Sequence, residues 1–157
     1  METFAPAFIY RHTKVRIVTE RHTEFIDLTE SLEELVTESR VLTGFVNVQS
    51  LHTTAAIVVN EGEPLLLKDF ECTLRKLAPD DAAYRHDDET IRTFNLNPGE
   101  RPNGSSHCKA LLLSSSACLN VVDGRLLLGR WQRVFLAELD GPRPRDISVL
   151  LIGEAAQ

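Results

Sequence analysis

One stretch of the chain, Leu51–Pro64, constrains the fold more than any other. It opens with polar residues 52–54, continues as the apolar and mostly β-branched run 55–59, and ends on Asn60 and Glu61 before a glycine and a proline interrupt it. Such a run predicts a strand with at least one buried face. Polar groups at both ends of a buried strand cost free energy unless hydrogen-bond partners or a ligand satisfy them. We therefore expect the rest of the chain to bring further polar groups to this strand.

The length and charge of the chain limit the classes of fold and function. With 157 residues we expect one domain, residues 1–157. The net charge of −6 argues against general nucleic-acid binding, which requires a basic face. A local basic pocket for a phosphorylated small molecule remains compatible with that charge. The sequence contains no Ser-centred nucleophile elbow, P-loop or glycine-rich dinucleotide fingerprint.

The sequence carries no signal for a membrane or for an oxidising compartment. No apolar run approaches the roughly 18 residues of a membrane span, and the N-terminus lacks a basic start and apolar core. Cys72, Cys108 and Cys118 are an odd number and form no C-x-x-C pair, so we expect buried free thiols rather than disulfides. Free thiols are typical of a reducing compartment, and we expect a cytoplasmic protein. Cys108 adjoins His107, but we interpret it as structural.

Periodicity and turn residues predict mixed α and β structure with antiparallel hairpins in the second half. Ser31 and Glu34 form a candidate capping box for the first helix, and Gly44 is expected beyond its end in a left-handed conformation. Asp123-Gly124 predicts a two-residue hairpin turn. Strands are predicted over residues 8–19, 24–28, 45–50, 117–122, 125–128, 130–139 and 147–152, and helices over 29–42, from 64 to the proline at 79, and from 105 or 106 to 112.

Residues 80–103 are polar and rich in turn residues, and a loop of this length is typically a functional lid or disordered. His86 lies near its start and His107 just past its end, so the loop is a candidate cover for a ligand pocket. Ser105 or Ser106 is expected to cap the helix that follows. This would set His107 near the positive helix N-terminus, where free backbone N–H groups can bind an anion.

His52, His86 and His107 come from three separate parts of the chain. None has the short spacing of a metal motif, so two interpretations stay open: one shared pocket, or three separately satisfied side chains. Neutral imidazoles with a nearby carboxylate such as Glu61 could bind a divalent ion or transfer protons near neutral pH. His12 and His22 are expected on the surface.

Five arginines crowd the C-terminal third, and two of them, Arg143 and Arg145, flank Pro144. A rigid turn could hold both guanidinium groups for bidentate phosphate binding. The alternative is a set of surface arginines that balance the many acidic residues. Trp131 lies on a predicted strand and is expected in the core or at an interface rather than as a stacking platform.

Taken together, these pieces resemble the YjbQ family, also described as secondary thiamine-phosphate synthase enzymes. The similarity covers nearly the whole chain, in order. Each piece is weak alone, and the ordered set is specific. The pieces are residues 52–56 with Asn60-Glu61, residues 84–87, His107 with Lys109-Ala110, residues 123–126, Leu128-Gly129 with Trp131-Gln132, and residues 140–143 with Arg145.

The resemblance implies an α+β subunit with a largely antiparallel β-sandwich, a few helices and assembly as a homotrimer. It implies that His52, His86 and His107 form a catalytic pocket able to hold a divalent ion, Mg²⁺ or Zn²⁺, with Glu61 as a further catalytic group. Substrate binding would fall to Asn60, Arg143, Arg145 and Lys109.

The activity implied is that of a thiamine-phosphate synthase, as a secondary function. It joins an aminopyrimidine diphosphate to a thiazole phosphate and releases pyrophosphate. The alternative is a non-catalytic trimeric module that binds a metal or a phosphorylated metabolite, and a metal-assisted hydrolase is a third reading. The sequence departs from the family pattern in residues 102–106 before the third histidine, in the serines at 114–116, at Arg130 and in the longer loop 88–102.

Overall fold

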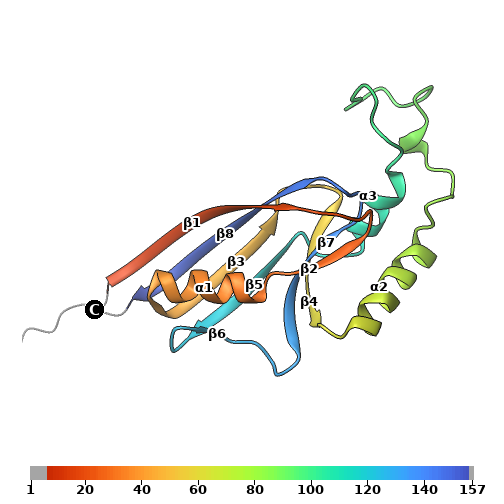
Figure 1. The fold of residues 1–157 in the computed structure, drawn as a ribbon. Coiled ribbons are helices and arrows are strands. Elements are labelled where there is room, and N and C mark those ends of the chain that lie inside the picture. Colours follow the sequence, from red (N-terminus) through yellow and green to blue (C-terminus); the bar gives the residue numbers. More distant parts are fainter. Residues whose placement is uncertain (1–6, 156–157) are drawn as a thin grey trace, which may run out of the picture.

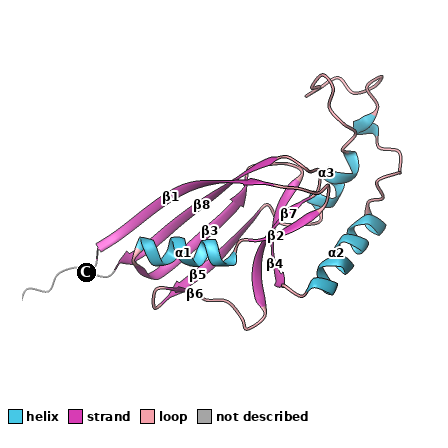
Figure 2. Cartoon of the chain, viewed as in Figure 1, coloured by secondary structure: helices cyan, strands magenta, loops and turns pink. Residues whose placement is uncertain are grey.

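The protein is described here by a computed structural model that covers residues 7–155. Two antiparallel sheets form the domain, one with the strand order β1-β8-β3-β5-β6 and the other with the order β2-β7-β4 (Figures 1 and 2). The strands are β1 (Ala7–Val18), β2 (Glu24–Asp27), β3 (Val41–Ser50), β4 (Ala55–Glu61), β5 (Ser116–Val122), β6 (Arg125–Leu126), β7 (Gln132–Glu138) and β8 (Pro144–Ala155); the helices are α1 (Thr29–Ser39), α2 (Pro64–Leu77), the short 3₁₀ turn η1 (Arg85–Asp87) and α3 (Gly104–Leu111). The α+β class with antiparallel pairing is confirmed.

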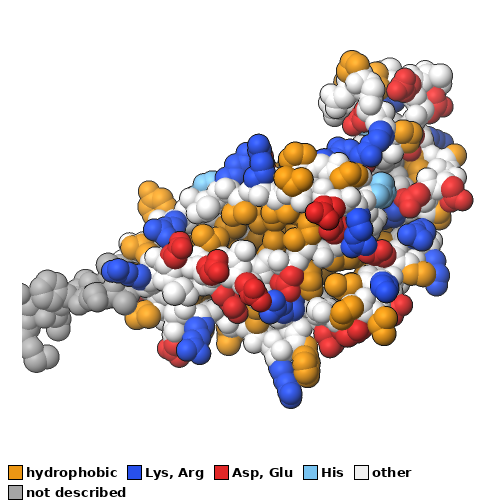
Figure 3. Space-filling view, viewed as in Figure 1, with side chains coloured by type: hydrophobic (Ala, Val, Ile, Leu, Met, Phe, Trp, Pro, Cys, Tyr) orange, Lys and Arg blue, Asp and Glu red, His pale blue; other side chains and the backbone are white. Residues whose placement is uncertain are grey.

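The core lies between the two sheets and α1. On β8, Ile147, Val149 and Leu151 are buried, whereas the residues between them are half-buried, which is the period-two alternation of a strand with one apolar face. The inner faces of β3, β4, β5 and β7 and two positions of α1 complete the same cluster. Hydrophobic side chains also reach the surface in a strip between β1 and α1 (Figure 3).

Helix α1 begins at Thr29, as predicted, but it is shorter than predicted at its C-terminal end. It ends at Ser39, where Arg40 adopts the left-handed conformation with φ 61°. Gly44 instead lies within β3 opposite Gly153 of β8, and a Cβ at Gly44 would overlap the carbonyl oxygen of Ile152. The predicted capping box is also wrong, because Asp27 accepts the N–H of Thr29 at 2.8 Å and the first turn begins there.

Helix α2 begins and ends as predicted, but it packs loosely. Glu63 caps it by accepting the N–H groups of Leu65 at 2.9 Å and Leu66 at 2.8 Å. Leu66, Phe70, Leu74 and Leu77 recur at the spacing of one helix face, but only Leu74 is fully buried, and Leu77 is 64% exposed. The reason is that α2 lies over the outer face of the smaller sheet and has no further layer on its other side: the Phe70 ring packs 5.8 Å, centroid to centroid, from Phe25 of β2, and a cavity lined partly by Val58 of β4 remains beneath the helix.

The loop between α2 and α3 is organised by one arginine. Arg92 donates to Glu100 at 3.0 Å and to the backbone carbonyls of His86, Phe94 and Asn95 at 3.3, 3.2 and 2.6 Å. The loop therefore has hydrogen bonds of its own, and it projects beyond α3 away from the sheets (Figure 1).

The hairpin between β5 and β6 turns at Asp123 and Gly124, both with positive φ, as predicted. No helix within residues 7–155 is long and apolar enough to cross a membrane.

Candidate functional site

His52 lies where the chain leaves β3 of one sheet and enters β4 of the other. Its Nε2 accepts the backbone N–H of Asp146 at 2.8 Å, and this contact fixes the orientation of the ring. Because Nε2 supplies the lone pair, the neutral imidazole carries its proton on Nδ1. The side chain also lines a surface cavity, so this ring can offer a hydrogen-bond donor to a ligand.

His86 and His107 pack against each other beside α3. Their ring centroids are 4.6 Å apart and the planes meet at 65°, an edge-to-face arrangement. His107 is in the first turn of α3 and His86 is in η1. Nε2 of His86 is buried and has no hydrogen-bond partner among the residues that the structure describes. This pair therefore includes one buried ring nitrogen, Nε2 of His86, that is available to a ligand or a metal ion.

The structure brings His52 and His107 to one cavity of about 670 Å³. His86 contacts His107 but is not part of the lining. The polar lining contains no Asp, Glu, Lys or Arg, and the apolar lining comes mainly from the end of α3. The cavity is lined by Gln49, Ser50, Leu51, His52, Thr53, Ala55, His107, Ala110, Leu111, Leu113 and Ser115.

The start of α3 is capped from outside the helix, not by its own serines. Oδ1 of Asp87 accepts the N–H groups of Asn103 at 2.9 Å and Gly104 at 2.8 Å. Ser105 donates to Asp80 and Ser106 to the carbonyl of Leu139. The predicted serine cap is therefore wrong, and Asp87 already occupies part of the helix terminus that could have bound an anion.

Both cavity histidines favour the neutral form. Burial lowers the pKa of His52 below its ordinary value of 6.5, and the positive charge of Arg145 lowers it further. Burial likewise lowers the pKa of His107, and the neighbouring His86 adds to this effect. Near neutral pH the cavity therefore presents uncharged imidazoles, able to donate or accept a hydrogen bond.

The cationic side chains predicted to bind phosphate are already paired. Arg145 pairs with Glu138, and their side chains are 2% and 0% exposed. Arg143 pairs with Asp140 at 2.8 Å, and the buried Lys109 pairs with Asp80. None of the three cations lines the cavity. They stabilise the walls of the site in this structure.

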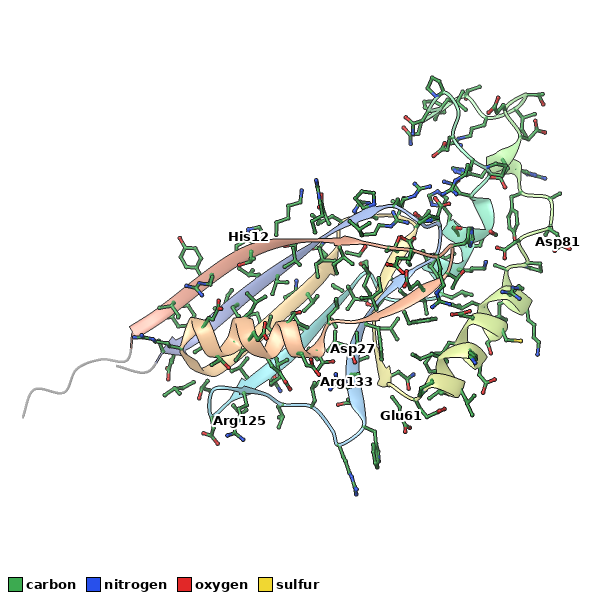
Figure 4. All side chains as sticks on the ribbon, viewed as in Figure 1. His12, Asp27, Glu61, Asp81, Arg125 and Arg133 are labelled. Atoms are coloured by element: carbon green, nitrogen blue, oxygen red, sulfur yellow. The ribbon has the colours of Figure 1, made fainter. Side chains whose placement is uncertain are left out.

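Asn60 and Glu61 lie at the opposite end of β4 from His52. The seven-residue strand is roughly 20 Å long, so they lie far from His52, and Figure 4 shows Glu61 where β4 leads into α2. They line a separate shallow cavity with Trp131 and Gln132. Trp131 is 61% exposed with the Arg130 guanidinium 4.6 Å from its ring, so it is not a core residue.

The residues present in one chain supply only part of a metal site. Within residues 7–155, no three side chains of the His, Cys, Asp and Glu types are arranged to hold one ion together. His86 and His107 supply two neighbouring imidazoles, one with an unused buried nitrogen. Cys72, Cys108 and Cys118 are free thiols as predicted, but all are exposed rather than buried. His12 and His22 are exposed, as predicted.

Sequence reasoning missed the two acidic residues that organise the site. Glu138 pairs with Arg145 behind His52. Asp140 forms an ion pair with Arg143 at 2.8 Å and accepts a hydrogen bond from the side-chain amide of Asn103 at 3.3 Å. Both residues are fully buried. A signal for Glu138 did exist, since it ends an apolar strand where an unpaired carboxylate would be costly. Its partner could not be named from the sequence.

Comparisons with known proteins agree on one family. The model described as UPF0047 protein YjbQ-like matches residues 13–154. A UPF0047 protein of Methanothermobacter thermautotrophicus is 39% identical over 136 residues, which cover 87% of each chain. One from Archaeoglobus fulgidus is 40% identical over 136 residues, 87% of this chain and 97% of the relative.

Solved structures show the same architecture. A YbjQ-like protein of unknown function from Sulfolobus solfataricus P2 superposes with a TM-score of 0.84 at 30% identity, covering 94% of this chain and 100% of that one. A hypothetical protein from Aeropyrum pernix K1 gives a TM-score of 0.80 at 32% identity over 92% and 99% of the two chains. Sequence and fold together show that this chain belongs to the UPF0047 (YjbQ-like) protein family.

Proposed function

We propose that the cavity between His52 and His107 binds a phosphorylated heterocycle and supports a slow transferase reaction of the thiamine-phosphate synthase type. The observation that carries the proposal is that two neutral imidazoles from distant parts of the chain line one cavity of about 670 Å³. That volume lies in the range of cavities that hold ligands of this size.

In the proposed reaction the thiazole nitrogen attacks the methylene carbon of the aminopyrimidine diphosphate. The carbon–nitrogen bond forms, the carbon–oxygen bond to the diphosphate breaks, and pyrophosphate leaves with the electron pair. His52 would donate from Nδ1, and Ser50, Thr53 and Ser115 would add neutral polar groups. A divalent ion, Mg²⁺ or Zn²⁺, would neutralise the diphosphate charge, and His86 and His107 are the residues that would hold it.

The test is to mix the purified protein with both substrates and Mg²⁺ and to measure thiamine phosphate and pyrophosphate. His52→Ala and His107→Ala should each abolish product formation. His12→Ala is the matched control, because His12 lies on β1 away from α3 (Figure 4) and its ring contacts Ser148. Unchanged turnover in both cavity variants would exclude this site as the catalyst.

A second candidate function is a non-catalytic module that binds a metal or a phosphorylated metabolite. It is favoured by the pairing of Arg143, Arg145 and Lys109 with carboxylates, which leaves no lysine or arginine in the cavity lining to stabilise a departing diphosphate. This proposal predicts saturable binding of Zn²⁺ or of thiazole phosphate by calorimetry without turnover. Pyrophosphate release above background would contradict it.

We also propose a homotrimer in the cytoplasm. Asn60 and Glu61 lie too far along β4 to reach His52 of the same chain, so a site that uses all three residues needs a second copy. Exposed free thiols suit a reducing compartment. Light scattering of the purified chain tests the trimer, and a monomeric mass would contradict it.

A further inference from the structure

The turn that carries His52 is held by two consecutive residues of β8. Asp146 donates its N–H to Nε2 of His52 at 2.8 Å and accepts the N–H of Leu51 at 3.2 Å. The preceding residue, Arg145, donates through Nη2 to both oxygens of Thr54, at 2.9 Å to Oγ1 and 3.3 Å to the carbonyl. The backbone that carries the imidazole is thus held before it at Leu51 and after it at Thr54.

Arg145 is fixed in turn by Glu138 of the other sheet. Nε of Arg145 donates to Oε2 of Glu138 at 2.6 Å, and Nη2 donates to Oε1. Oε1 of Glu138 also accepts the N–H groups of Leu139 and Asp140, both at 2.8 Å. With these bonds made, the guanidinium cannot turn towards the cavity without leaving a buried carboxylate unpaired.

We propose that the Arg145–Glu138 ion pair is a positioning device that holds His52 as a neutral imidazole with its proton on Nδ1, so that the cavity takes a ligand offering a hydrogen-bond acceptor at that point. The inference uses the cavity of the proposed function but none of its transferase chemistry. A backbone N–H is always a donor, so Nε2 of His52 must remain a lone pair wherever Asp146 is held in place.

Burial and the surrounding charges together also favour the neutral form of His52. Burial lowers its pKa, Arg145 and Arg143 lower it further, and the opposing effects of Asp146 and Glu138 do not overcome them. In this neutral ring Nδ1 already carries a proton and Nε2 accepts the N–H of Asp146, so neither nitrogen can take a proton from a substrate. His52 is therefore assigned as a hydrogen-bond donor to the ligand and not as a general base.

The first test is nitrogen-15 NMR of the full chain labelled at histidine. At neutral pH we expect the Nε2 signal of His52 in the range of an unprotonated nitrogen and the Nδ1 signal in the range of an N–H. His22 on the exposed turn after β1 is the internal control, and should show the average of both tautomers. A protonated Nε2 on His52 in the wild-type protein would overturn the proposal.

The positioning role is tested by removing the pair as a unit. The double variant Glu138→Gln, Arg145→Met avoids a lone buried charge, and in it the His52 signals should move to tautomer-averaged positions. Thr54→Val removes only the Oγ1 acceptor and should shift the same signals in the same direction by less. Unchanged His52 signals in either folded variant would contradict the positioning role. If the double variant does not fold, the Thr54→Val result alone tests the role.

The ligand class is tested with two opposite probes at equal ionic strength. Inorganic phosphate offers acceptor oxygens, whereas guanidinium offers only donors. Phosphate should shift the Nδ1 signal of His52 saturably, and guanidinium should not. A response to guanidinium, or no saturable response to phosphate, would overturn the acceptor assignment. Turnover is not needed for either result, so failure here is distinguishable from failure of the transferase proposal.

Discussion

Lys109 and Asp80 form an ion pair that is buried on one side only: the lysine side chain is 2% exposed and the aspartate side chain is 44% exposed. Asp80 also accepts the hydroxyl of Ser105 at 2.9 Å. These bonds from two α3 side chains hold its pKa below the ordinary value, although burial acts in the opposite direction. The pair joins the end of α2 to the helix that carries His107.

Asp80→Asn should destabilise the protein strongly for a residue of this exposure. The substitution leaves the Lys109 ammonium buried without its counter-charge, which costs about 3 kcal/mol, the lower end of the range for a broken buried pair. Urea unfolding measures it. Asp81→Asn is the matched control, because its exposed carboxylate is next in sequence, and an equal loss in both variants would contradict the assignment.

Acidification should destabilise the fold through the cavity histidines. The pKa values of His52 and His107 are lowered in the folded state, so the unfolded chain takes up their protons first. The stabilising contribution is complete above the unfolded value of 6.5 and is lost as the pH falls through the folded pKa. Urea midpoints between about pH 7.5 and pH 5 measure this. His52→Gln should flatten the dependence, and His12→Gln should leave it unchanged.

The cap on α3 should depend on the acceptor atom of Asp87 rather than on its charge. Asp87→Ala removes the acceptor for two backbone N–H groups and should cost about 1 kcal/mol. Asp87→Asn keeps an oxygen in the same place and should restore most of that stability. Urea unfolding of both variants gives the comparison. Equal losses would show that the charge, and not the cap, matters.

Arg92 should control the order of the projecting loop. Arg92→Gln removes the hydrogen bonds that join Glu100 to three carbonyls, so amide hydrogen exchange in residues 93–102 should accelerate while the strands are unaffected. Arg85→Gln is the control, since Arg85 is exposed in η1. Exchange rates equal to the wild type would exclude this role.

The local parts of the fold were readable from the sequence because their signals are local. Asp123-Gly124 predicts its hairpin since both positions need positive φ. Pro64 and Pro79 bound α2 through the missing N–H and fixed φ of proline. Errors occurred where a distant group decides the outcome. Gly44 is a glycine because β8 approaches it closely, not because it ends a helix.

The candidate site was likewise predictable in its local features and not in its long-range contacts. Its residue types and the strand that leads from His52 were evident from the sequence, because a polar group beside a buried apolar run needs a partner. The sequence alone could not show that Asp146 holds His52, that Asp87 caps α3, or that the arginines at 143 and 145 are paired within the fold.

The sequence by itself determined the antiparallel α+β class, most element positions and the candidate histidines, since these depend on periodicity and turn chemistry over a few residues. Only the tertiary structure decided which charges remain available to a ligand. Glu138 and Arg145 are close in sequence but lie on strands of different sheets, and their pairing depends on how those sheets pack. A buried charge takes the partner that packing provides, and the packing of two sheets is not encoded in the spacing of the paired residues.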